Sequence, residues 1–180
     1  MVKLSAGLLL HRVRGPGLPP EVLLVHPGGP FWARRDAGAW SIPKGEYEEA
    51  EQPLAAARRE FEEELGLPVP AGDLSELGAI EQPSGKVVTA FTLRADLDLA
   101  GFRSNTFDLE WPRGSGTIHA FPEVDRAAWF DLAQARTRLL KGQVGFLDRL
   151  ADFLAAAGET IAEGAAQHGD SPAQAPERQP

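Results

Sequence analysis

The segment Pro53–Leu65 constrains the fold more than any other part of the sequence. It consists of strong helix formers, begins with a proline suited to the first helical position, and is followed by Gly66, a residue suited to a helix C-cap. At about 100° per residue, its apolar residues fall on one stripe and its glutamates on an adjacent one: Leu54, Ala57, Phe61 and Leu65 beside Glu60, Glu63 and Glu64. The pattern predicts a helix with one face in a core and the other lined by carboxylates.

The three glutamates are neighbours on this helix, because residues three and four apart lie side by side. Two unit charges about 4 Å apart repel by roughly 4 kcal/mol at an effective dielectric constant near 20. A hard divalent cation such as Mg²⁺ would neutralise them, since it prefers carboxylate oxygens, a backbone carbonyl and water. The alternative is an ordinary solvated acidic helix face whose side chains point apart.

Short β-prone runs surround this helix and are separated by glycine- and proline-rich turns. We expect strands at 4–13, 21–26, 39–43, 77–81, 86–97, 117–121 and 127–130, and two further helices at 131–140 and 143–157. A sheet flanked by helices follows from this order, so the expected fold class is α/β or α+β.

Composition narrows the classes of function. The 180 residues allow one domain, expected at 1–157, and the segment 158–180 has too few large apolar residues to fold and is expected to be disordered. A net charge of −8 argues against a nucleic-acid binder, and the lack of cysteine excludes disulfides and thiolate sites. No apolar run approaches the length of a membrane span, so a soluble cytoplasmic protein is expected.

The segment 45–67, GEYEEAEQPLAAARREFEEELGL, resembles the Nudix box, Gly-x5-Glu-x7-Arg-Glu-U-x-Glu-Glu-x-Gly-U, in which U is a bulky apolar residue. The match has no gaps and lies in the strand, loop and helix context that the motif needs. The specified positions are filled by Gly45, Glu51, Arg59, Glu60, Phe61, Glu63, Glu64, Gly66 and Leu67. The resemblance implies the Nudix fold, a mixed β-sheet sandwiched between helices.

The resemblance also implies a metal centre. Glu60, Glu63 and Glu64 match the family's metal-binding carboxylates, and the backbone carbonyl of Lys44 would add a further ligand. The expected cofactor is Mg²⁺, for which Mn²⁺ could substitute.

Other residues of the box are assigned supporting roles by the same resemblance. Arg59 matches the arginine that orients the glutamates through charge-assisted hydrogen bonds and is counted with Glu63 and Glu64 as catalytic. Glu51 and Gly45 match positions that lie beside the ligands without binding the metal.

Outside the box, many family members carry a further glutamate six residues before a tryptophan, where it binds metal or acts as the general base. Glu123 and Trp129 show this spacing, which implies a catalytic and metal-binding role for Glu123. Glu110, next to Trp111, competes for the same role, and a plain surface carboxylate is the alternative for either.

Substrate contacts are expected from aromatic rings and cations near the box. Trp32, Arg34, Lys44 and Lys86 are the chosen candidates for binding a base or phosphate. Core or surface packing competes with a binding role for the remaining aromatic, cationic and histidine candidates: His26, Trp40, Phe107, Trp111, Arg35, Arg103 and His119.

The expected function is Mg²⁺-dependent hydrolysis of a phosphoanhydride bond in a nucleoside diphosphate linked to another moiety. The loop Pro43-Lys44-Gly45 resembles that of dinucleoside polyphosphate and diphosphoinositol polyphosphate hydrolases, whereas Pro83 resembles a placement in ADP-ribose pyrophosphatases. The first class is preferred, as a monomer or homodimer acting on a small molecule. A nucleotide-sensing module without catalysis is the alternative from a different class, and a calcium-binding acidic helix lacks the expected Asp-rich loop.

Overall fold

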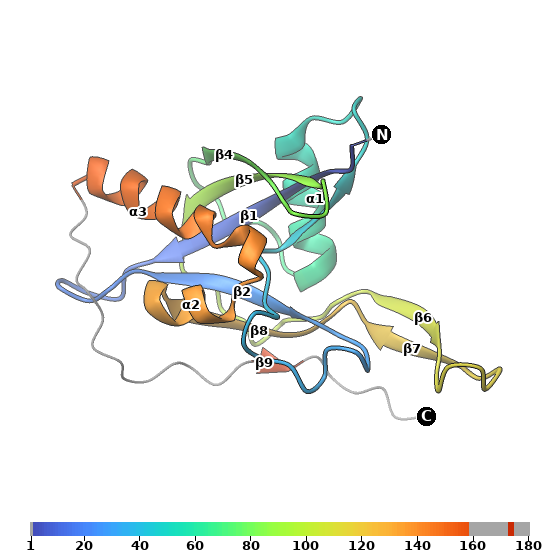
Figure 1. The fold of residues 1–180 in the computed structure, drawn as a ribbon. Coiled ribbons are helices and arrows are strands. Elements are labelled where there is room, and N and C mark those ends of the chain that lie inside the picture. The colour runs from blue at the N-terminus through green and yellow to red at the C-terminus, as the bar shows by residue number, and fades with distance from the viewer. Residues whose placement is uncertain (1, 159–172, 175–180) are drawn as a thin grey trace.

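A mixed sheet runs through the centre of the molecule in the computed structural model, which describes residues 2–158 and 173–174 (Figure 1). Its strand order is β4-β5-β1-β2-β8-β9, and β3 pairs with β1 beside this path. β1 is parallel to β5 and antiparallel to β2 and β3. The bounds are β1 Leu4–Arg12, β2 Glu21–Pro27, β3 Lys44–Tyr47, β4 Ser75–Glu81, β5 Val87–Arg94, β8 Val124–Asp131 and β9 Ala173–Gln174.

Helices cover both faces of this sheet. α1, Pro53–Leu65, lies on one face, while α2, Leu132–Arg138, and α3, Gly145–Ala156, lie on the other, with a 3₁₀ turn at Lys141–Gln143 between them (Figure 1). The predicted fold class, a mixed sheet between helices, is therefore confirmed.

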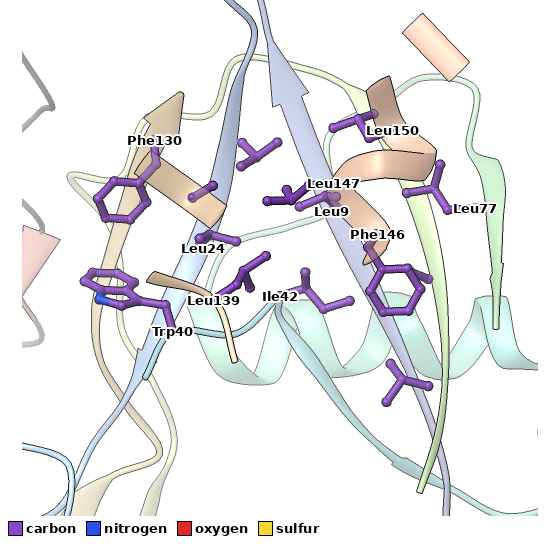
Figure 2. Packing of buried hydrophobic residues seen from close by; sticks show 14 of the residues in the cluster. Leu9, Leu24, Trp40, Ile42, Leu77, Phe130, Leu139, Phe146, Leu147 and Leu150 are labelled. Carbon is purple, nitrogen blue, oxygen red and sulfur yellow. The ribbon is translucent and has the colours of Figure 1, made fainter. Parts of the chain in front are cut away.

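Each face has its own apolar core, because β1 and β2 alternate side chains between the two faces. Leu9, Leu24, Trp40, Phe146 and Leu147 belong to the core under α3 (Figure 2). The core under α1 contains Leu8, Leu10, Leu23, Phe61 and Leu65, among others. All ten of these side chains are at most 1% exposed, so α1 is fixed against the sheet as firmly as α3.

The predicted helix at Pro53–Leu65 is confirmed with the same bounds. Gly66 ends it in the left-handed conformation at φ 64°, and its N–H donates to the Glu62 carbonyl. The backbone carbonyl of Arg103 packs so closely on Gly66 that a Cβ there would overlap it. Glycine is thus required at this position both by the backbone angle and by the lack of space.

The prediction of a strand at 39–43 is wrong. The strand in this region is β3, Lys44–Tyr47, and its register with β1 places Lys44 opposite Gly7 and Gly45 opposite Ala6. Trp40 and Ser41 form only isolated bridges, to Leu139 and Val25. Gly7 makes the close approach possible, because a Cβ there would lie 2.5 Å from the Pro43 carbonyl oxygen.

A second, two-stranded sheet was only half predicted. β7, Ile118–Pro122, matches the strand expected at 117–121, but its partner β6, Thr106–Glu110, was not expected. Figure 1 shows this pair extending away from the main sheet.

The C-terminal part of the sequence is described only at Gly158 and at the two residues of β9, whose backbone pairs with Arg126 and Ala127 of β8. The disordered tail predicted at 158–180 otherwise lies outside the described residues, so the division at 157 stays a prediction. Within the described part of the chain, no helix has the length and apolar character needed to cross a membrane.

Candidate active site

The site begins where α1 packs beside β3. Glu60 lies one turn from the end of α1, and its carboxylate rests against the α-carbon of Gly45, so that a Cβ at residue 45 would overlap it. The Glu60 side chain is only 14% exposed. The glycine of the box is therefore needed because the carboxylate occupies the space that any side chain would fill.

Arg59 is the cation at the centre of this carboxylate group. Its guanidinium donates to Glu51 at 3.2 Å, to Glu60 at 2.5 Å and to Glu63 at 3.3 Å. It also donates to the Glu46 carbonyl at 3.4 Å. The hydrogen bond that Arg59 donates to Glu51 raises the pKa of Arg59 further above its usual range, so the guanidinium stays charged and fixes the orientation of three acids.

Glu64 lies on the inner side of the same helix end. Its Oε2 accepts a hydrogen bond from the backbone N–H of Lys44 at 3.1 Å. Desolvation by burial raises the pKa of Glu64 to about 8, against the lowering effect of the Lys44 charge and N–H. Removal from water therefore outweighs the positive charge of Lys44 and favours the neutral form of this carboxyl group.

Glu123 comes from the other side of the site, just before β8, and is exposed. Desolvation raises the pKa of Glu60, and the charges of Glu63 and Glu123 raise it further; Glu123 acts in the same direction on Glu64. The backbone fixes Glu123 at both ends: its N–H donates to the Asn105 carbonyl at 2.8 Å and its carbonyl accepts from Gly28 at 2.9 Å.

Glu110, the competing candidate, has a different environment. It ends β6, and its Oε1 accepts a hydrogen bond from the Gly116 N–H at 2.5 Å, which closes the turn between β6 and β7. Of the two glutamates, only Glu123 affects the pKa of the box carboxylates. The structure therefore brings Glu123, and not Glu110, to α1.

These oxygen donors suit a hard divalent cation. The charges of Glu60 and Glu123 act on Glu64, and Arg59 is the cation that contacts Glu60. A bound cation would favour the charged forms of Glu60 and Glu64, whose pKa values are raised. Within 2–158 and 173–174, however, no three acidic or histidine side chains already stand in metal-binding geometry. The donors fit the ion by their chemistry.

The expected substrate residues have different surroundings. Arg34 is exposed on the loop 28–36, and Trp32 is partly buried, packs on the α3-side core and lies 5.4 Å from the Arg35 guanidinium. Lys86 is paired with Glu46 at 2.7 Å. The Lys44 charge acts on Glu64, which places this lysine nearest the box carboxylates of the four.

His26 and Trp40 are buried and are not stacking surfaces, at 0% and 1% exposure. The His26 ring contacts Asp125 Oδ1 through Nδ1 and the Arg35 carbonyl through Nε2, both at 2.7 Å. His26 thereby links the loop 28–36 to the strand that follows Glu123.

Asn105 and Asp125 were missed by the sequence interpretation. Asn105 donates its N–H to the Glu63 carbonyl at 3.3 Å and accepts from Glu123, so it connects the two sides of the site. Both contacts use backbone atoms, which no residue type or spacing reveals. The partnership of Asp125 with His26 joins residues 99 apart in the sequence and likewise leaves no local pattern.

Comparisons with known proteins agree with this geometry. The family model of the NUDIX domain matches residues 1–150. No curated protein matches the chain.

Solved structures show the same fold at low sequence identity. A Caenorhabditis elegans Ap4A hydrolase in a binary complex has a TM-score of 0.56 at 20% identity, covering 84% of this chain and 98% of that one. The NUDIX domain of Shewanella oneidensis NrtR, complexed with ADP ribose, has a TM-score of 0.56 at 16% identity, covering 84% of this chain and 87% of that one. A mutT/nudix family protein from Listeria innocua has a TM-score of 0.55 at 19% identity, covering 87% of this chain and 96% of that one.

The predicted resemblance is thus confirmed, and with it the class of enzyme, a Nudix-type hydrolase. With the ungapped box folded around Gly45 and Arg59 and the family model matched over residues 1–150, the chain belongs to the Nudix domain family.

Proposed function

We propose that this protein is a Mg²⁺-dependent hydrolase that cleaves a phosphoanhydride bond of a nucleoside diphosphate linked to another moiety. The observation that carries the proposal is the excess of carboxylates between α1 and Glu123, with raised pKa values at Glu60 and Glu64. Mg²⁺, when bound, supplies the charge that neutralises diphosphate oxygens and makes nearby water more acidic.

Residues of the chain would hold the ion and order the reactants. We assign Glu60, Glu63, Glu64, Glu123 and the Lys44 carbonyl as ligands. Arg59 and Glu51 would keep the α1 carboxylates in position, as their hydrogen bonds at 3.2 Å indicate. We assign the Lys44 ammonium, whose charge acts on Glu64, as a contact for a substrate phosphate.

Glu123 is our candidate for the general base. In the step we propose, water attacks phosphorus, a proton passes to Glu123, and the bridging phosphorus–oxygen bond breaks. Two phosphate-containing products result, and the proton on Glu123 is later released to solvent. Its exposure suits this exchange with water.

For the substrate, we propose a dinucleoside polyphosphate or related nucleotide. The motif Pro43-Lys44-Gly45 supports this class, since β3 places it directly beside Glu60 and Glu64. Pro83, the marker for ADP-ribose, lies instead in the turn after β4, near Gly142. ADP-ribose or a nucleotide sugar is therefore the second substrate class to assay.

The test is hydrolysis of a nucleotide panel with Mg²⁺ by the parent protein and by Glu63→Gln and Glu64→Gln. Both variants should lose at least about 10²-fold in kcat, because they remove charge stabilisation of the transition state. Glu62→Gln is the matched control, as Glu62 is an exposed residue of the same helix. Equal turnover in all four proteins would refute the proposal, and tight nucleotide binding without any product would favour a sensing module.

A further inference from the structure

The two-stranded sheet of β6 and β7 has one face rich in aromatic residues. Phe107 pairs with Phe121 and Leu109 with His119, and Trp111 continues the ladder by donating its N–H to the Thr117 carbonyl at 2.9 Å. Because alternate residues of a strand share a face, these side chains lie together. We call Phe107, Leu109, Trp111, His119 and Phe121 the aromatic face.

The loop 28–36 lies along this face. A Cβ at Gly29 would be 3.1 Å from the Phe107 ring, so the loop backbone contacts the start of the face. Further out, the rings of Phe31 and Trp111 meet edge to face, with centroids 5.4 Å apart and planes at 82°. Phe31 nevertheless remains 61% exposed. Core packing therefore does not account for a phenylalanine and a tryptophan at this place.

The aromatic face begins at the carboxylate site. Asn105, immediately before β6, donates to the Glu63 carbonyl at 3.3 Å, and its own carbonyl accepts from Glu123 at 2.8 Å. Gly28, at the start of the loop, donates to the Glu123 carbonyl at 2.9 Å. Trp111 is six residues beyond Asn105, a span of about 20 Å in an extended strand. The aromatic face therefore begins beside Glu63 and Glu123 and extends away from these acids.

The far end of the loop is fixed as well. His26 holds the Arg35 carbonyl at 2.7 Å, and the Asp36 carboxylate accepts from the Trp40 indole N–H at 2.8 Å. Asp36 also pairs with Arg138. Phe31 thus lies between two anchored ends, so less ordering entropy is lost when a ligand binds to it.

We propose that Phe31 and Trp111 bind the nucleobase of the substrate, an inference that rests on the proposed function and specifies which part of the nucleotide is recognised there. An aromatic ring can stack on any base because every base has a π-face. In a protein of net charge −8, an uncharged aromatic face suits the base better than the phosphates. The distance of about 20 Å from Asn105 fits a long substrate whose phosphates lie at the carboxylates and whose far base reaches the pair.

The experiment compares the parent protein with Phe31→Ala, Trp111→Ala, Trp111→Phe and the control Ile118→Ala. Ile118 is 61% exposed and pairs with Glu110. Because alternate residues of a strand share a face, this pair lies on the opposite face of the two strands from Phe107 and Leu109. Binding of ADP is measured by calorimetry. Hydrolysis is measured with a dinucleoside polyphosphate and with inorganic triphosphate, which has no base.

We expect Phe31→Ala and Trp111→Ala each to weaken ADP binding and to raise KM for the dinucleoside substrate by about 10-fold. The kcat should stay within about 3-fold, because stacking is equal in the ground and transition states. Trp111→Phe should restore most of the affinity. Inorganic triphosphate should be hydrolysed equally by all variants.

The inference is overturned if ADP fails to bind the parent, if Trp111→Ala binds ADP as Ile118→Ala does, or if hydrolysis of inorganic triphosphate falls in parallel. Loss of ADP affinity in Trp111→Ala in a protein that hydrolyses nothing would leave the base site standing while the proposed function fails. If Trp111→Ala hydrolyses the dinucleoside substrate with an unchanged KM and binds ADP with unchanged affinity, the base site is refuted while the proposed function stands.

Discussion

α3 and α1 lie on opposite faces of the main sheet and bury their apolar stripes equally well. Phe146 and Leu147 on α3, like Phe61 and Leu65 on α1, are 0% exposed. The helices differ on their polar sides. On α3, Arg149 donates to the carbonyls of Leu77 and Ala79 at 2.8 and 3.0 Å, while the Asp148 carboxylate pairs with Arg136 at 2.5 Å.

On α1, several acids share one cation. Arg59 alone is shared by Glu51, Glu60 and Glu63, while Glu64 has the Lys44 N–H and a nearby ammonium. Burial is therefore the same on both faces and does not tell which helix carries function. The sharing of one cation by three acids and the raised pKa values of Glu60 and Glu64 distinguish α1, because a bound cation would stabilise these acids.

The largest effect expected is on stability. Phe146→Ala should lower the free energy of unfolding by about 3–5 kcal/mol, since it leaves a cavity in the α3-side core. The kcat per folded molecule should not change, because α3 does not contact the carboxylates. Urea denaturation with an active-site titration measures both.

Phe61→Ala on α1 is the matched variant for the other face. It should destabilise by a similar amount but also lower kcat, because α1 positions Glu60 and Glu64. If the two variants affect activity alike, the two faces are not distinct in function.

The next effect is catalytic. Glu64→Gln should lower kcat by at least about 10²-fold, as proposed above, while the metal-free protein keeps its stability. An amide resembles the neutral acid that the raised pKa of Glu64 favours, and it can still accept from the Lys44 N–H. A thermal melt in the presence of a chelator measures stability, and a loss as large as that of Phe61→Ala would contradict this explanation.

A smaller effect on kcat is expected from Glu123, and Glu110 provides the comparison. Glu123→Gln should lower kcat by roughly 10- to 100-fold, at or below the usual range for general-base catalysis because water can partly replace the base. Glu110→Gln should change it little, since that side chain bonds the Gly116 N–H in the turn. Pre-steady-state kinetics would separate the chemical step from product release. Equal losses would show that Glu110 also reaches the reaction.

Per pH unit, the smallest effect is the dependence of the free energy of unfolding on pH. The pKa of Glu64 is raised from its ordinary value to about 8 in the folded protein, so the folded state keeps a proton that the unfolded chain releases above about pH 4.5. Stability of the metal-free protein should fall as the pH rises from about 4.5 to 8, by at most about 1.4 kcal/mol per pH unit.

Two controls identify the source of this slope. Mg²⁺ should reduce it, because the ion favours the charged carboxylate, and Glu64→Gln should reduce it as well. Chemical denaturation at several pH values provides the measurement. A slope that is the same with and without Mg²⁺ and in the variant would mean that other groups cause it.

The sequence predicted α1 well because its information is local. Helix propensity, the proline at the start, Gly66 at the end and the spacing of the glutamates all lie within Pro53–Leu65 and its flanks. The box adds Gly45, which contacts Glu60, and Glu51, which accepts a hydrogen bond from Arg59.

The sequence could not predict what depends on distant contacts. β3 has only four residues and forms where β1 offers a register, so its position could not be read from its own pattern. β6 is short and none of its five residues is fully buried, which weakens the apolar signal that identifies a strand. The choice between Glu123 and Glu110 depends on the backbone bonds of Asn105, which no side-chain pattern encodes.

The parallel pairing of β1 with β5 has a consequence for folding during synthesis. Leu4 pairs with Val87, so more than 80 further residues have to be synthesised before β1 can pair with β5. The loop closure for such distant pairs makes them slow to form. Since Glu123 lies still further along the chain, the residues of α1 are synthesised long before the acid proposed to face them. Ribosome-bound intermediates of this protein are then expected to be inactive until β8 has emerged.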